Sequence, residues 1–171
     1  DIEIARRLGA DGVVFGCLTA DGEVDLTSMQ ILMEASKGLS VTFHRAFDVC
    51  RNPQKALEEI IELGCNRILT SGQQPTAEQG IGLLKELQGL AAGRITLLAG
   101  CGVNENNIAR IAAETGINEL HFSARESIQS EMKFRNEVVS MGGTVHINEY
   151  ERNVTSVRRV KETVEALYKG M

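Results

Sequence analysis

The sequence has no tryptophan, few aromatic residues, only two prolines and no excess of positive charge. Phe, Trp and Tyr make up 4% of its 171 residues, and 18 Lys and Arg stand against 23 Asp and Glu. Nucleic-acid binding needs a basic face, and single-strand binding needs aromatic stacking platforms, so neither is predicted. There is no apolar run of the ~18 residues that a membrane-spanning helix needs and no recognisable signal peptide. These absences predict a cytoplasmic protein without a membrane partner.

The four cysteines do not form a chelating motif. Cys17, Cys50, Cys65 and Cys101 include no C-x-x-C pair, and a reducing cytosol would keep them as free thiols. Thiolates are soft ligands that suit Cu(I), and Cys101 precedes a predicted helix that can lower a thiol pKa. Cys17 and Cys101 are therefore candidate copper ligands, although small thiols without ligand spacing are more often structural.

Glycines divide the chain into repeating units, each an amphipathic stretch followed by a short apolar run. The junctions LGADGVVFG, LGCNRILTS and TGINELHFS are alike, and in each a glycine suits the left-handed position after a helix. The predicted strands are 13–16, 41–44, 67–71, 95–99 and 119–123. The clearest helices are 53–63, capped by Asn52 with Pro53 at its first position, and 105–115, with Asn104 as its expected cap.

Strands that alternate with helices predict a parallel α/β sheet, as an open doubly wound sheet or as part of a (β/α)₈ barrel. In VTFHRA, Val41 and Phe43 share one face, and Thr42 and His44 share the other. A central strand of an open sheet is apolar on both faces, whereas the inner face of a barrel can turn polar near a binding site. The pattern favours the barrel, with the five strands in sequential order.

The stretch VTFHRAFD ends a predicted strand on three ionisable side chains, His44, Arg45 and Asp48. Ligands bind at the carboxyl ends of strands in parallel α/β folds. There His44 can act as an acid or base, Arg45 can hold a carboxylate or phosphate, and Asp48 can orient either of them. The alternative is an Arg–Asp pair that ties a loop, beside a hydrogen-bonded histidine of the core.

Three further strand ends, 69–74, 99–107 and 122–125, are rich in glycine and small polar residues. Backbone N–H groups in such turns attract anions, and the last two strand–helix loops of a barrel often grip phosphate. The sequence therefore predicts an anion site here, unless these glycines serve only to make tight turns.

VTFHRAFD, ILTSG, AGCGV and MKFRN, at 41–48, 68–72, 99–103 and 132–136, resemble the CutC family, described as copper homeostasis proteins. The resemblance follows the whole chain in order. It implies a cytoplasmic, often oligomeric (β/α)₈ barrel with Cu(I) as cofactor or partner. It also implies that residues 1–171 form one partial barrel domain holding about strands four to eight. The three preceding units, with the cysteines usually proposed to bind copper in the family, have no counterpart here.

Three functional hypotheses follow. The resemblance implies the first, a copper homeostasis protein. The polar residues at the strand ends support the second, a barrel enzyme that acts on a small anionic metabolite, and the third is a structural module whose pocket is vestigial. The resemblance and the strand ends together select His44, Arg45 and Asp48 as catalytic candidates, and Thr70, Ser71, Gly72, Gly100, Gly102, His121, Ser123 and Arg125 as anion-binding candidates. A homo-oligomer is expected, and whether the protein is an enzyme stays open at this point.

Overall fold

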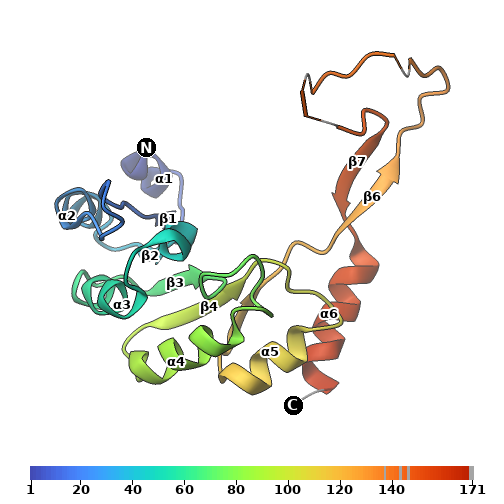
Figure 1. Cartoon of the computed structure of the whole chain (residues 1–171). Helices are drawn as coiled ribbons and strands as arrows, with labels where there is room; N and C mark the ends of the chain where they lie inside the picture. The colour runs from blue at the N-terminus through green and yellow to red at the C-terminus, as the bar shows by residue number, and fades with distance from the viewer. Residues whose placement is uncertain (137, 143, 146, 170–171) are drawn as a thin grey trace.

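The structure is a computed structural model that describes residues 1–171 apart from 137, 143, 146, 170 and 171. Its elements alternate along the chain as the sequence predicts (Figure 1). They are α1 (Ile2–Arg7), β1 (Gly12–Phe15), α2 (Leu26–Ala35), β2 (Ser40–Phe43), the 3-10 helix η1 (Arg45–Val49), α3 (Pro53–Glu62), β3 (Arg67–Thr70), α4 (Ile81–Ala91), β4 (Thr96–Gly100), α5 (Ile108–Thr115), β5 (Glu119–His121), β6 (Arg125–Gln129), β7 (Glu151–Thr155) and α6 (Val157–Lys169).

Local capping signals explain where the helices begin. The Asn52 side chain accepts a hydrogen bond from the Lys55 N–H at 3.0 Å, and Pro53 opens α3, as predicted. For the helix predicted over 105–115, the predicted start is wrong, because α5 begins at Ile108. The Asn104 side chain accepts from the Asn106 N–H at 2.9 Å and so closes a turn before the helix instead of capping it.

The five strands β1 to β5 form one parallel sheet in sequential order. The order confirms the barrel-type arrangement and excludes a doubly wound sheet, in which the strand order reverses. In register, Val13 of β1 lies beside Val41 of β2, and Leu69 of β3 beside Leu98 of β4. The carboxyl ends of all five strands therefore lie along one edge of the sheet.

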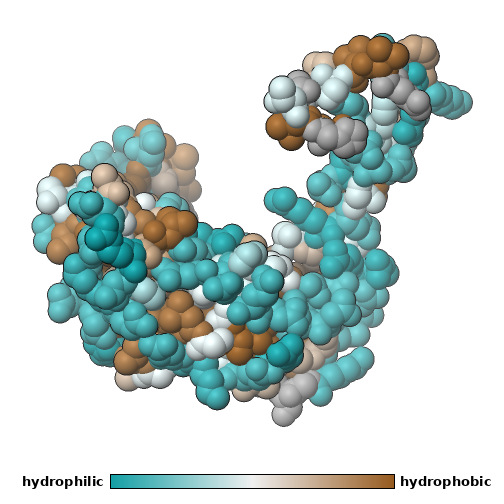
Figure 2. All heavy atoms as spheres, viewed as in Figure 1, coloured by the Kyte–Doolittle hydropathy of each residue, from teal (hydrophilic) through white to brown (hydrophobic). Residues whose placement is uncertain are grey.

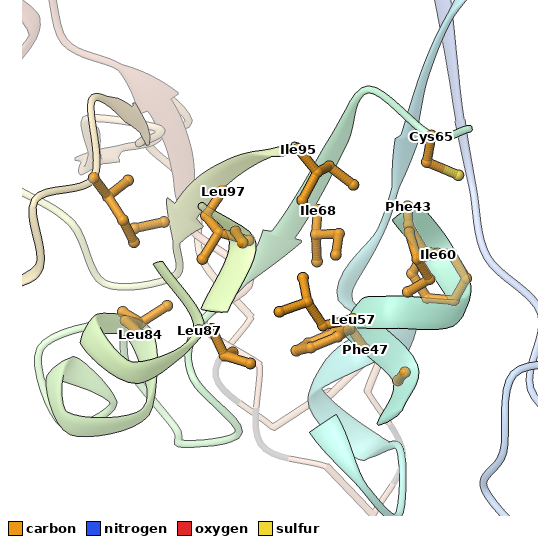
Figure 3. Close-up of a cluster of buried hydrophobic side chains, with 14 of the residues drawn as sticks. Phe43, Phe47, Leu57, Ile60, Cys65, Ile68, Leu84, Leu87, Ile95 and Leu97 are labelled. Atoms are coloured by element: carbon orange, nitrogen blue, oxygen red, sulfur yellow. The ribbon is translucent and has the colours of Figure 1, made fainter. Parts of the chain in front are cut away.

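The hydrophobic core fills the space between the sheet and the helices that cover one of its faces (Figure 3). Val41 and Phe43 of β2 are 1% and 0% exposed in this layer, and Leu57 and Ile60 of α3 pack there as well. Thr42 and His44 are only half-buried. The alternation along β2 therefore separates a helix-packed face from a second face, as the sequence predicts.

A hairpin arm, which the sequence did not predict, follows the sheet. Strands β6 and β7 pair antiparallel, and the arm extends away from the body of the molecule (Figure 1). Its distal part exposes many apolar side chains, and some of them are visible as brown spheres in Figure 2. They are Met132, Phe134, Val138, Val139, Met141, Val145 and Ile147. Among the described residues, the helices are too short or too polar to cross a membrane.

Candidate functional site

The Asp48 carboxylate joins the loops that follow β2 and β3. Its side chain is only 6% exposed. Its Oδ1 accepts from the Thr70 hydroxyl at 2.6 Å, the Ser71 N–H at 2.9 Å and the Gln73 N–H at 3.2 Å. Its Oδ2 accepts from the Ser71 hydroxyl at 3.1 Å and from Arg45 Nε at 2.6 Å. A buried carboxylate needs such a set of donors, and here the set also fixes the backbone of two adjacent loops.

Arg45 leaves the strand direction because η1 begins at this residue. Its Nε donates to Asp48, and its Nη2 donates to the Ser71 hydroxyl at 3.0 Å. The hydrogen bond to Asp48 raises the pKa of Arg45 further above its usual value, so the guanidinium is always charged. The side chain is 43% exposed and lies on the wall of an open cavity.

This cavity, of about 460 Å³, is formed by strand-end loops and by α6. It contains three arginines, one histidine, small polar residues and an apolar part. The lining residues are Arg45, Leu69, Cys101, Gly102, Val103, Asn104, His121, Phe122, Ser123, Ala124, Arg125 and Arg159. Positive side chains at a concave site attract anionic ligands.

The backbone of the cavity loops adopts an uncommon conformation. Cys101 has φ 80°, Gly102 φ 73° and Ala124 φ 46°, all in the left-handed region. For residues other than glycine this conformation costs about 1 kcal/mol or more, and such strain gathers at functional sites. Successive N–H groups in loops of this kind form concavities that bind anions.

Arg159 and Arg125 both lie on the cavity wall, but only Arg159 is paired with a carboxylate within the described residues. Arg159 of α6 forms a two-pronged ion pair with Glu105, Nε to Oε1 and Nη2 to Oε2, each at 3.0 Å. This pair holds the pKa of the Glu105 carboxyl below its usual value. Arg125 has no carboxylate partner for its guanidinium within the described residues. Arg125 is therefore the more available positive charge, and Arg159 mainly fastens α6 to the loop after β4.

The structure brings part of the predicted site together. Arg45, Gly102, His121, Ser123 and Arg125 line the cavity, whereas Thr70 and Ser71 are fully buried and support Asp48. The other predicted residues that do not line the cavity are His44, Asp48, Gly72 and Gly100.

His44 Nδ1 accepts a hydrogen bond from the Ala46 N–H at 3.2 Å and so caps η1. This contact occupies one of its two ring nitrogens in a structural role. His121, in contrast, lies on the cavity wall and is exposed, with no side-chain hydrogen bond within the described residues. Of these two histidines, His121 is therefore the one available to a ligand.

Close packing explains the glycines of the loop after β3. A Cβ on Gly80 would lie 1.9 Å from the Ser71 carbonyl oxygen, and one on Gly72 would lie 2.5 Å from the Gly80 carbonyl oxygen. Gly72 also has φ 69°. The chain here folds back on itself, and only glycine permits the approach.

The cysteines fall into two pairs. Burial raises the pKa of the Cys50 and Cys65 thiols to about 11. Cys17 and Cys101 are half-buried, but they follow β1 and β4, which two other strands separate. Over the residues that the structure describes, no cluster of three His, Cys, Asp or Glu side chains has the arrangement of a metal site.

The sequence did not point to Arg159, because the helix that carries it was not assigned. The apolar positions of VRRVKETVEALYK recur at helical spacing, and that pattern predicts an amphipathic helix over 157–169. The cavity also contains Leu69, Val103, Asn104, Phe122 and Ala124, which lie in the three predicted strand-end stretches but were not selected individually as site residues.

A sequential parallel sheet with a strand-end cavity defines a protein of the β/α-barrel class. Comparison with known proteins identifies the relatives. The model of the CutC family matches residues 1–126. A CutC family protein from Bacteroides thetaiotaomicron is 77% identical over 167 residues, which cover 98% of this chain and 67% of the relative. One from Parabacteroides distasonis is 56% identical over 161 residues, covering 94% of this chain and 66% of the relative.

A solved structure agrees with these matches. The crystal structure of a putative copper homeostasis protein CutC from Streptococcus agalactiae has a TM-score of 0.68 and 33% identity, and the match covers 70% of this chain and 59% of that one. This chain belongs to the CutC family, as its sequence motifs indicated. It spans about two thirds of the length of the curated relatives that it matches.

Proposed function

We propose that the cavity binds a small anionic metabolite, and that the protein acts on it as an enzyme. The observation that supports this most directly is the Arg125 guanidinium, which has no carboxylate partner within the described residues and lies on the same cavity wall as Arg45. Two cationic forks that face one cavity are the usual means of holding a phosphate or carboxylate.

In this proposal the three residues of VTFHRAFD have different roles. Arg45 contacts the ligand, whereas Asp48 is a positioning residue that sets the direction of Arg45. His44 caps η1, so the proton-transfer role moves to His121 on the cavity wall. Histidine is the side chain best suited to exchange a proton near neutral pH.

Isothermal titration calorimetry with inorganic phosphate tests the proposal. The Arg125→Gln variant should lose at least about tenfold in affinity, because a charge-assisted contact contributes about 1.5–3 kcal/mol. The matched control is Arg158→Gln, which removes an arginine that pairs with Glu126 and Glu162 outside the cavity. No phosphate binding by the parent protein, or an equal loss in both variants, would contradict the proposal.

Copper binding is the second candidate function. The CutC family and the Streptococcus agalactiae relative, described as a putative copper homeostasis protein, support a relation to copper. The half-buried thiol of Cys101 lies on the cavity wall and is the best-placed candidate ligand. Cys17 follows β1 and Cys101 follows β4, and strands β2 and β3 lie between them. Because the two thiols are separated in this way, we expect only weak Cu(I) binding by this chain.

A Cu(I) titration against a competing chelator, with Cys101→Ser and Cys17→Ser as variants, measures this affinity. Tight one-to-one binding that either substitution abolishes would show that the two thiols act together. The cytoplasmic location and the homo-oligomeric state stay predictions, and light scattering after gel filtration measures the second of them.

A further inference from the structure

We propose, on the basis of the function proposed above, that the ligand class is an organic phosphate monoester with a compact apolar body. Inorganic phosphate would fill only part of the cavity, and a carboxylate would offer fewer acceptor oxygens to its hydrogen-bond donors. The inference follows from the number of hydrogen-bond donors at the loops and from the composition and size of the remaining wall.

The donors suit an anion with more than two oxygens. Among the described residues, the backbone N–H groups of Gly102, Val103, Ser123 and Ala124 have no intramolecular acceptor, and all four residues line the cavity. The Arg125 guanidinium adds further N–H groups. A carboxylate offers two oxygens, whereas a phosphate monoester offers three terminal oxygens that are strong acceptors. A phosphate group therefore offers more acceptor oxygens to the donors of these lining residues than a carboxylate does.

The balance of charge at the cavity also favours an anion. Arg45 is held beside the cavity by Asp48, whose single negative charge it already balances. Arg159 is balanced in the same way by Glu105. Arg125 remains as an unbalanced charge, and the left-handed loops at Cys101–Gly102 and at Ala124 direct further partial positive charge to an anion.

Part of the remaining wall is apolar. Leu69 extends from β3, Val103 from the loop after β4, and Phe122 from the end of β5, and these three side chains line the same cavity as the arginines. The cavity volume of about 460 Å³ has room for roughly fifteen water-sized groups. A phosphate group fills about five of these positions, which leaves space for a body of about ten non-hydrogen atoms.

Phenyl phosphate, inorganic phosphate and benzoate are the probes that separate the parts of this inference. Phenyl phosphate should bind about tenfold or more tightly than inorganic phosphate, because its ring is buried against the apolar wall. It should also bind about tenfold or more tightly than benzoate, which has the same ring but a singly charged group with two oxygens. In the Leu69→Ala variant, the affinity for phenyl phosphate should exceed that for inorganic phosphate by a smaller factor than in the parent protein.

Calorimetry on the parent protein, on Leu69→Ala and on Arg125→Gln distinguishes the outcomes. Equal affinity for phenyl phosphate and inorganic phosphate would overturn the inference that the ligand has an apolar body, and would leave the proposed function intact. Equal affinity for benzoate and phenyl phosphate would overturn the phosphate group in the same way. If none of the three probes binds, the proposed function itself fails. In the expected outcome, the parent protein shows the predicted order of affinities, and Arg125→Gln binds phenyl phosphate and inorganic phosphate more weakly than the parent. These two results together would support the proposed function and the phosphate monoester as its ligand class.

Discussion

The substitution Asp48→Asn separates an electrostatic role of this residue from a positioning role. The parent carboxylate is 6% exposed and accepts hydrogen bonds from Arg45, Thr70, Ser71 and Gln73. Asparagine keeps one acceptor oxygen, so the donors at Oδ1 retain their partner. Its amide group, however, places N–H donors against the Arg45 Nε and the Ser71 hydroxyl, and the ion pair is lost.

The expected cost is about 3 kcal/mol, because a charge-assisted hydrogen bond contributes about 1.5–3 kcal/mol and its loss leaves Arg45 without its partner. For a chain of this length that corresponds to a fall in melting temperature of about 6–12 °C. Urea unfolding followed by circular dichroism measures the change in the free energy of unfolding, and calorimetry with inorganic phosphate measures binding at a temperature where the variant is folded.

Binding gives the sharper test because the two roles predict opposite signs. If Asp48 acts only through its charge, removing that charge strengthens phosphate binding by Coulomb attraction. If it positions Arg45, the variant binds phosphate several-fold more weakly even though a negative charge has been removed. A variant that is as stable as the parent and binds phosphate more tightly would refute the positioning role.

Three further predictions concern the loops, the thiols and a helix cap. Gly80→Ala should destabilise the fold by about 2 kcal/mol or more, because its Cβ would overlap the Ser71 carbonyl, whereas Gly82→Ala, which meets no atom within 4 Å, is the control in urea unfolding. The free energy of unfolding should fall between about pH 8.5 and about pH 11, by roughly 2 kcal/mol per thiol. Burial raises the pKa of Cys50 and Cys65 to about 11 in the folded protein, so only the unfolded chain loses those protons in this range. A Cys50→Ala, Cys65→Ala double variant should show a flatter pH profile, and an unchanged profile would contradict the assignment. Asn52→Ala should cost about 1 kcal/mol in the same assay through the lost cap of α3, and no change would show that the cap contributes little.

The sequence predicts those features that neighbouring residues determine. The cap of α3 depends on Asn52 and Lys55, and the burial of Val41 and Phe43 follows from alternation within one strand. The strand order follows from repeated units of similar length, because short crossovers place successive strands side by side.

The parts that were not predicted depend on distant residues or on polar strands. Asp48 meets Thr70 and Ser71 from a separate loop, and no local pattern signals that contact. The strands of the arm, Arg125–Gln129 and Glu151–Thr155, are largely polar and mostly exposed, so they lack the apolar alternation that identifies a strand. From the sequence, the strand ends could be selected only as a region, and identifying the residues that line the cavity there required the three-dimensional structure.

The shared carboxylate of Asp48 also limits how this protein can change over generations. Loops at the strand ends of β/α barrels usually vary in length and sequence independently of one another, which lets the fold acquire new chemistry. Here the loops after β2 and β3 are joined through one side chain. An insertion in the second loop would displace the donors of Asp48 and with them Arg45, so tolerated changes in these two loops are expected to occur together.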